Sequence, residues 1–325
     1  MAHIKIFIDG GANLNIAYAS DNNFVDVMCV SIMSFNDHNY DATIYILDCG
    51  IEEHNKQKIL ELCSGKNTVL FVDTKKVFDK LPDNLNLDRG SIAAYARLFI
   101  GSMLPQNIEK ILYLDSDTLI RESLKELFGI SLESFVIGGV RDSFSVFNKE
   151  VFGIKKGGLM INSGVLLIDL TKWRKQRIEE KIYQLIDKKK KVFQGDQGII
   201  NTIFHGEVKE LPLKYDVMTY LYDFSYEEMI CYRKPDNYFS KEDIKKNIEN
   251  PAIVHFSSSF KSYRPWENAT CTHPYFDEWN KLFSKSGGNR TNNNKRLICT
   301  NSKMVFGLIG ILHAYLRPLR QKIIC

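Results

Sequence analysis

The first half of the chain alternates short apolar runs with longer stretches in which apolar residues recur every three or four positions. The short runs are rich in Ile, Val, Leu and Tyr and predict strands at 15–20, 43–47, 67–73 and 111–114. The longer stretches predict helices from the polar turn at 21–23 through residue 35, at 52–63, and at 91–104 before Pro105. This alternation indicates βαβ units, so we expect an α/β fold with a mostly parallel sheet and helices on both faces.

The second half of the chain is less regular. It predicts strands at 136–139, 160–169 and 253–256, and helices at 177–189 and 196–204. A Ser-, Gly- and Asn-rich stretch at 284–294 is typical of a linker. We therefore expect a catalytic domain at 1–283, the linker at 284–294 and a small helical tail at 295–325. Residues 3–13 fit an extra edge strand.

Charge is distributed unevenly along the 325 residues. From Trp279 to Cys325 there are nine Lys or Arg and no Asp or Glu, so the rest has 34 basic against 39 acidic residues. Seven scattered cysteines form no zinc-type pair, and the first residues lack a secretory pattern, which favours a reducing, cytoplasmic location. A nucleic-acid partner is not expected, because the basic residues gather in an apolar tail without a stacking platform.

The tail contains a mostly apolar run at 304–316 between basic residues. A spanning helix needs about 20 residues, so this run is too short to cross a membrane. A basic apolar segment can lie in the interface of an anionic membrane, so peripheral attachment to the inner face of the membrane is one interpretation of this tail. The alternative is a helix that packs against the main domain.

The strand at 111–114 runs directly into Asp115-Ser116-Asp117. Residues i and i+2 of an extended chain point to the same side, so Asp115 and Asp117 can converge on one hard cation. Two carboxylates leave coordination positions free for water and for the oxygens of a diphosphate. Loop solvation or a helix cap is the alternative role of such an acidic pair.

Six blocks of sequence together resemble family 8 glycosyltransferases, the retaining group that includes bacterial lipopolysaccharide galactosyl- and glucosyltransferases and glycogenin. They are IAYASDNN at 16–23, YARL at 95–98, ILYLDSD at 111–117, INSGVLLID at 161–169, GDQGIIN at 195–201 and, more loosely, HFSSSFK at 255–261. The resemblance implies a GT-A fold, in which a Rossmann-like nucleotide-binding half joins an acceptor-binding half. It also implies a UDP-sugar donor and Mn²⁺, with Mg²⁺ as the alternative ion.

The resemblance also assigns roles to single residues. It implies Asp115, Asp117 and His255 as metal ligands. It implies donor-binding roles for Ala19, Asp21, Asn23, Arg97, Ser116, Asn162, Ser258 and Lys261, the last as a phosphate-binding lysine. Near the anomeric carbon it implies the amide of Gln197, which favours a front-face route, with Asp196 as the alternative nucleophile.

The chain departs from the family pattern in one place. Ser258 stands where the family commonly has glycine, and Ser-Tyr is inserted before Arg264-Pro-Trp. Arg264 could therefore share the phosphate-binding role of Lys261.

The leading hypothesis is a retaining, Mn²⁺-dependent hexosyltransferase. It would move glucose or galactose from a UDP-sugar to a saccharide or glycolipid acceptor in bacterial surface-polysaccharide or glycoconjugate synthesis. One alternative is a glycogenin-like primer that glucosylates itself. Another is a catalytically silent module that binds a nucleotide-sugar.

Overall fold

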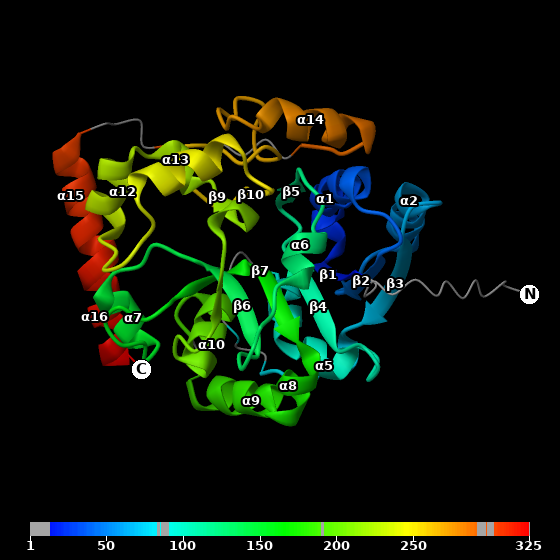
Figure 1. Cartoon of the computed structure of the whole chain (residues 1–325), viewed down its shortest axis with the longest axis horizontal. Helices are drawn as coiled ribbons and strands as arrows, with labels where there is room; N and C mark the ends of the chain where they lie inside the picture. Colours follow the sequence, from blue (N-terminus) through cyan, green and yellow to red (C-terminus); the bar gives the residue numbers. More distant parts are fainter. Residues whose placement is uncertain are drawn as a thin grey trace, which may run out of the picture.

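The computed structural model describes residues 14–82, 85, 91–189, 192–290, 297 and 302–324. The edge strand suggested for 3–13 lies outside these residues. The chain forms a central seven-stranded sheet flanked by helices, with a small second sheet beside it (Figure 1).

The central sheet has the strand order β3-β2-β1-β4-β7-β6-β8. Strands β3, β2, β1 and β4 are parallel, β7 is antiparallel to both of its neighbours, and β8 is parallel to β6. The prediction of a mostly parallel sheet is confirmed. The strands are β1 Asn15–Ser20, β2 Thr43–Asp48, β3 Thr68–Asp73, β4 Lys110–Leu114, β6 Ile137–Arg141, β7 Ile161–Asp169 and β8 Lys209–Leu211.

Helices cover both faces of this sheet, as the sequence predicts. Ile16 and Tyr18 of β1 pack with α1 (Val25–His38) and α2 (Glu53–Cys63) in one core. Ala17 and Ala19, which point the opposite way, belong to a second core. That core also contains residues of α8 Leu170–Lys175, α9 Ile178–Lys189 and α10 Gly195–Phe204 (Figure 1).

The prediction of a single α-helix at 91–104 is wrong. This segment consists of α4 (Ala93–Ala96), a 3₁₀ turn (Arg97–Phe99) and α5 (Ile100–Met103). The 3₁₀ turn begins at Arg97, whose Nε donates a hydrogen bond to the carbonyl of Ala94. Its Nη1 donates to the carbonyl of Ser163 in β7, so this side chain fixes the turn against the sheet.

The small sheet has the order β5-β10-β9, formed by Thr118–Ile120, Ile253–His255 and Val217–Met218. The sequence predicts only β10. The other helices are α3 Lys75–Phe78, which follows edge strand β3, and α6 Lys125–Gly129, α7 Val146–Val151, α11 Tyr220–Asp223, α12 Tyr226–Arg233, α13 Lys241–Glu249 and α14 Phe276–Lys285.

The tail is helical and packs along the main domain. It comprises α15 (Lys303–Ile311), a π-helical turn (Leu312–Leu316) and α16 (Arg317–Ile324), which lie beside α12 and α7 (Figure 1). Phe306, His313 and Ala314 are buried, whereas the outer side of the helix is apolar and exposed at Met304, Leu308, Ile311, Leu312, Leu316 and Leu319. None of the described helices has the length and apolar character needed to cross a membrane. Of the predicted linker, 284–285 end α14 and 291–294 lie outside the described residues.

Candidate active site

The site begins at the adjacent ends of β1 and β4. Because these strands are parallel neighbours, the chain leaves both at the same sheet edge. Asp115 follows β4 and Asp117 precedes β5, so the two acids occupy the sharp connection between the sheets. The Ser116 hydroxyl donates to the carbonyl of Ala19 at 3.0 Å, and the Asp115 amide donates to the carbonyl of Gly164 at 2.7 Å.

His255, at the end of β10, lies beside both acids. Its Nε2 is 3.3 Å from Oδ1 of Asp117 and 3.9 Å from Oδ2 of Asp115. The sequence-distant residues meet because β10 pairs with β5, which aligns His255 with Thr118. One potential ligand atom from each of these three side chains lies within 4.8 Å of the others, close enough to bind one metal ion. Among the described residues, no other group of three His, Cys, Asp or Glu side chains meets this criterion.

The donor set of this group fits a divalent cation. Two carboxylates and one imidazole suit Mn²⁺ better than the more strictly oxygen-seeking Mg²⁺. Burial disfavours the charged imidazole, but Asp216 and Asp117 outweigh it and raise the pKa of His255 well above its usual range. A fixed positive charge is therefore favourable at this point of the protein, whether a proton or a metal supplies it.

Arg97 connects the acids of the metal group to α10. Its Nη2 is 2.7 Å from Oδ1 of Asp115 and its Nε is 3.2 Å from Oδ2 of Asp196. The guanidinium also lies 4.5 Å from the ring centre of Tyr113. Burial alone would lower the pKa of Arg97, but the two carboxylates raise it, so the side chain is a permanent cation.

Asp196 and Gln197 open α10 and face the cavity. The Ser163 hydroxyl donates to Asp196 at 2.8 Å, and burial raises the pKa of this carboxyl although Arg97 opposes the change. The Gln197 oxygen accepts from Nδ2 of Asn162 at 3.2 Å, and its Nε2 donates to Oδ2 of Asp142 at 3.1 Å. These amides and carboxylates offer the paired donors and acceptors that sugar hydroxyls need.

A cavity of about 250 Å³ joins these groups. It is lined by eight of the predicted site residues, namely Arg97, Asp115, Asp117, Asn162, Asp196, Gln197, His255 and Ser258. The sequence analysis missed Asp142, Tyr220 and Arg233, which also line it. Asp142 directly follows β6, so the strand-end argument applied to Asp115 would have selected it; Tyr220 and Arg233 carry no comparable local signal.

Three predicted donor-binding residues lie at the end of β1. The carboxylate of Asp21 accepts from the Asn23 amide at 3.0 Å and from the Ser91 hydroxyl at 2.7 Å. Ala19 contributes its carbonyl to Ser116, as described above. Asp21 therefore caps the following turn, and a role in nucleotide binding stays a prediction.

The predicted phosphate-binding cations are not among the residues that line the cavity. Lys261 Nζ lies 3.5 Å from Oε2 of Glu228 and stacks over the rings of Phe224 and Phe306. The Arg264 guanidinium is engaged by Glu267 at 2.7 Å. In this arrangement both positive charges are compensated outside the cavity.

The sequence model for glycosyl transferase family 8 matches residues 15–270, a span that contains every residue of the cavity. The chain is a member of this family. General stress protein A of Bacillus subtilis (strain 168) is 26% identical over 290 residues, which are 86% of this chain and 96% of that protein. Lipopolysaccharide 1,2-glucosyltransferase of Escherichia coli (strain K12) is 27% identical over 263 residues, or 78% of this chain and 73% of that enzyme.

Solved structures give the same result for this family 8 member. The galactosyltransferase LgtC, solved in complex with donor and acceptor sugar analogs, superposes with a TM-score of 0.69 at 26% identity. The match covers 84% of this chain and 96% of LgtC. The α/β architecture is therefore the GT-A fold expected from the sequence, and the protein is a glycosyltransferase.

Proposed function

We propose that this glycosyltransferase is a retaining, metal-dependent hexosyltransferase. It moves glucose or galactose from a UDP-sugar to a saccharide or glycolipid acceptor in bacterial surface-polysaccharide or glycoconjugate synthesis. The observation that carries the proposal is the convergence of Asp115, Asp117 and His255 in one cavity with Asp196 and Gln197. The similarity to a lipopolysaccharide glucosyltransferase and to a galactosyltransferase supports the hexose donor.

Each group of the cavity has a task in this proposal. Asp115, Asp117 and His255 would hold Mn²⁺, which when bound would neutralise charge on the diphosphate leaving group. Arg97 keeps Asp115 in place and adds a permanent positive charge to the same region. Asn162 and Asp196 bind donor-sugar hydroxyls.

The stereochemical course rests on Asp196 and Gln197. Arg97 and Ser163 both contact Oδ2 of Asp196, and the positive charge of Arg97 makes this carboxylate a weaker nucleophile. Gln197 is an amide and a weak nucleophile, so it suits stabilisation of a cationic sugar through its carbonyl oxygen. This favours departure and attack on the same face of the sugar, with Asp196 as the alternative nucleophile.

The remaining donor contacts follow from the position of the β1 end. Ala19, Asp21, Asn23 and Ser116 would receive uridine and ribose, and Ser258 would approach the diphosphate. Lys261 would reach the diphosphate only after leaving Glu228. Its phosphate-binding role therefore requires a movement of the loop after β10.

The proposal is tested by measuring UDP release from UDP-glucose, UDP-galactose and UDP-N-acetylglucosamine, with Mn²⁺ or with EDTA. We expect Mn²⁺-dependent release from one hexose donor, and its loss in Asp117→Ala. Asp37→Ala, which changes an exposed acid far from the cavity, is the matched control. If no donor gives release and Mn²⁺ does not promote UDP binding, the proposal is wrong.

The outer side of the C-terminal helix supports attachment to the cytoplasmic face of a membrane. Its exposed apolar residues recur every three or four positions, and the neighbouring Arg317 and Arg320 are exposed. Such a surface can insert among acyl chains while the arginines contact anionic headgroups. A bound membrane would bring the cavity close to a lipid-linked acceptor.

Sedimentation with vesicles tests this attachment in the full chain. We expect binding to phosphatidylglycerol-containing vesicles and its loss in the double variant Leu308→Glu/Leu312→Glu. Leu60→Glu introduces one acid at an exposed leucine of α2 and should bind as the wild type does. Equal binding by all three proteins would exclude this surface as the membrane contact.

A further inference from the structure

Arg233, the last residue of α12, holds its guanidinium among aromatic rings. The central carbon is 4.8 Å from the ring centre of Tyr220 and 5.3 Å from those of Tyr232 and Phe144. Nη1 lies 3.3 Å from Nε2 of His313 in the C-terminal helix. Burial lowers the pKa of His313 to about 3, so its imidazole is neutral and can accept this hydrogen bond.

The charge of Arg233 lacks the compensation that Arg97 receives. Arg97 is bridged to Asp115 and Asp196, whereas Arg233 forms no ion pair with a carboxylate in the part of the chain that the structure describes. Its Nε is buried and has no hydrogen-bond partner. Arg233 is partly buried, and a cation in such a place without a carboxylate partner is unfavourable on its own, so an anionic ligand would relieve that cost.

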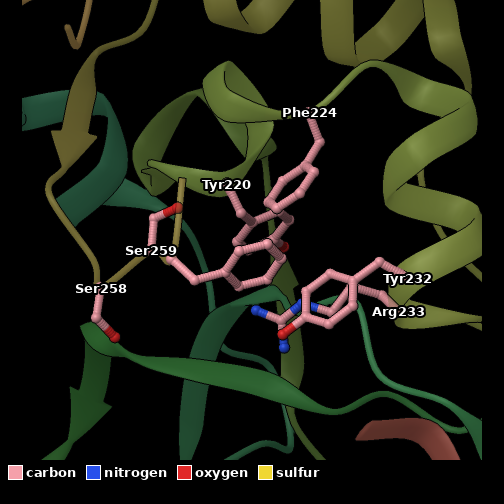
Figure 2. A pocket seen from close by; sticks show the side chains of 7 residues that line it. Tyr220, Phe224, Tyr232, Arg233, Ser258 and Ser259 are labelled. Carbon is pink, nitrogen blue, oxygen red and sulfur yellow. The ribbon is translucent and has the colours of Figure 1, made fainter. Parts of the chain in front are cut away.

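Arg233 also lies where two cavities meet. A second cavity, of about 290 Å³, shares Tyr220, Arg233 and Ser258 with the active-site cavity. Its other lining residues are Phe224, Tyr232, Ser259 and Phe260. Figure 2 shows the rings of Tyr220 and Tyr232 beside the guanidinium, with Ser258 and Ser259 across the space on the loop after β10.

Hydrogen bonds place the second cavity next to the catalytic residues. Gln197 donates to Asp142, and the Tyr220 hydroxyl donates to the other oxygen of Asp142 at 3.2 Å. The donor sugar is proposed to bind beside Asn162 and Asp196, at the other end of this series of hydrogen bonds. Ser258, which both cavities share, marks the proposed position of the diphosphate, so we assign a group held among Phe224, Tyr232 and Arg233 to the acceptor.

We propose that Arg233 binds an anionic group, a phosphate or a carboxylate, on the acceptor. This inference rests on the proposed function and names the class of its second substrate. The guanidinium offers a planar pair of donors that matches either anion, and the surrounding rings leave an apolar surface for the acceptor's sugar. The charge of Asp142 also acts on Arg233, without an ion pair between them, and it would disfavour an anion bound beside Gln197.

Matched acceptors test the inference in the full chain with Mn²⁺ and the donor that gives UDP release. The probes are methyl β-glucoside, its 6-phosphate and methyl β-glucuronide, and the readout is kcat/KM for sugar transfer. We expect at least one charged probe to exceed the neutral one by about 10- to 100-fold. The preference should disappear in Arg233→Gln and be partly retained in Arg233→Lys; the phosphate and uronide arms identify the anion.

The controls separate this inference from the proposed function. Arg121→Gln removes an arginine that also lies over a ring, that of Tyr275, but outside both cavities, and should keep the preference. If none of the probes is glycosylated, calorimetric binding to the complex with UDP and Mn²⁺ gives the same comparison. Equal use or equal binding of charged and neutral probes overturns the inference, as does a raised donor KM in Arg233→Gln with the preference intact. Absence of UDP release from every donor would instead count against the proposed function.

Discussion

Nδ1 of His255 lies 2.8 Å from Oδ1 of Asp216, a fully buried carboxylate just before β9. This contact turns the other ring nitrogen, Nε2, toward Asp117. It also fixes the Nδ1–H tautomer that a metal-bound imidazole requires. Asp216 therefore acts on the metal site through the orientation of His255, and the sequence analysis did not single it out.

Replacing Asp216 by Asn should weaken Mn²⁺ binding while leaving the fold intact. An amide can accept from Nδ1–H but carries no charge, so we expect a loss of about 10- to 100-fold in affinity. Calorimetric titration with Mn²⁺ measures the change, and a thermal melt checks the fold. An affinity equal to that of wild type would show that His255 is oriented by its packing alone.

Gly164 should not tolerate a side chain. A Cβ at this position of β7 would lie 2.9 Å from Oδ2 of Asp115 and closer still to the ring of His255. Gly164→Ala should therefore displace a ligand and reduce kcat/KM by roughly 100-fold, the effect of misplacing a site by about 1 Å. Gly129→Ala is the control, since nothing lies within 4 Å of its added Cβ. Similar turnover in both variants would contradict this account.

Arg97→Lys should be severely impaired although the charge is kept. One ammonium cannot reproduce the planar fork that contacts Asp115, Asp196 and the carbonyl of Ser163 together. We expect kcat/KM to fall by about 100-fold, with weaker Mn²⁺ binding because Asp115 loses its support. Steady-state kinetics and titration with Mn²⁺ measure the two effects. A variant that lost stability but kept normal kinetics when folded would assign Arg97 a purely structural role.

Local patterns were sufficient for the first four strands, β1 to β4, but not for the helical segment at 91–104. The strand at 15–20 has the observed bounds and the one at 43–47 is one residue short, because each is an apolar run bounded by polar residues. The same reasoning placed Asp115 at a strand end. The meeting of these acids with His255 came from the family resemblance, since it depends on the pairing of β10 with β5.

Long-range contacts account for what the sequence did not predict. β5 and β9 have three and two residues, too few for a periodic signal, and exist as partners of β10. Lys261 follows a local motif, yet Glu228 and Phe306, which tertiary packing brings near, hold its side chain outside the cavity. Side-chain orientation of this kind is decided by residues far away in the chain.

His273 should make the stability of the protein sensitive to mild acid. Burial lowers its pKa to about 3, whereas an unfolded chain has the ordinary value of about 6.5. Between these two pH values the unfolded state binds more protons than the folded state does. The contribution of His273 to the free energy of unfolding is therefore complete above about pH 6.5 and is lost as the pH falls. From pH 7.5 to pH 5 the free energy of unfolding should fall by about 2 kcal/mol through this histidine, and His273→Phe should remove that pH dependence.

Urea unfolding at both pH values measures the difference between variant and wild type. His54→Gln, at an exposed position, should retain the wild-type dependence, and an unchanged dependence in His273→Phe would show that His273 does not titrate as a buried group.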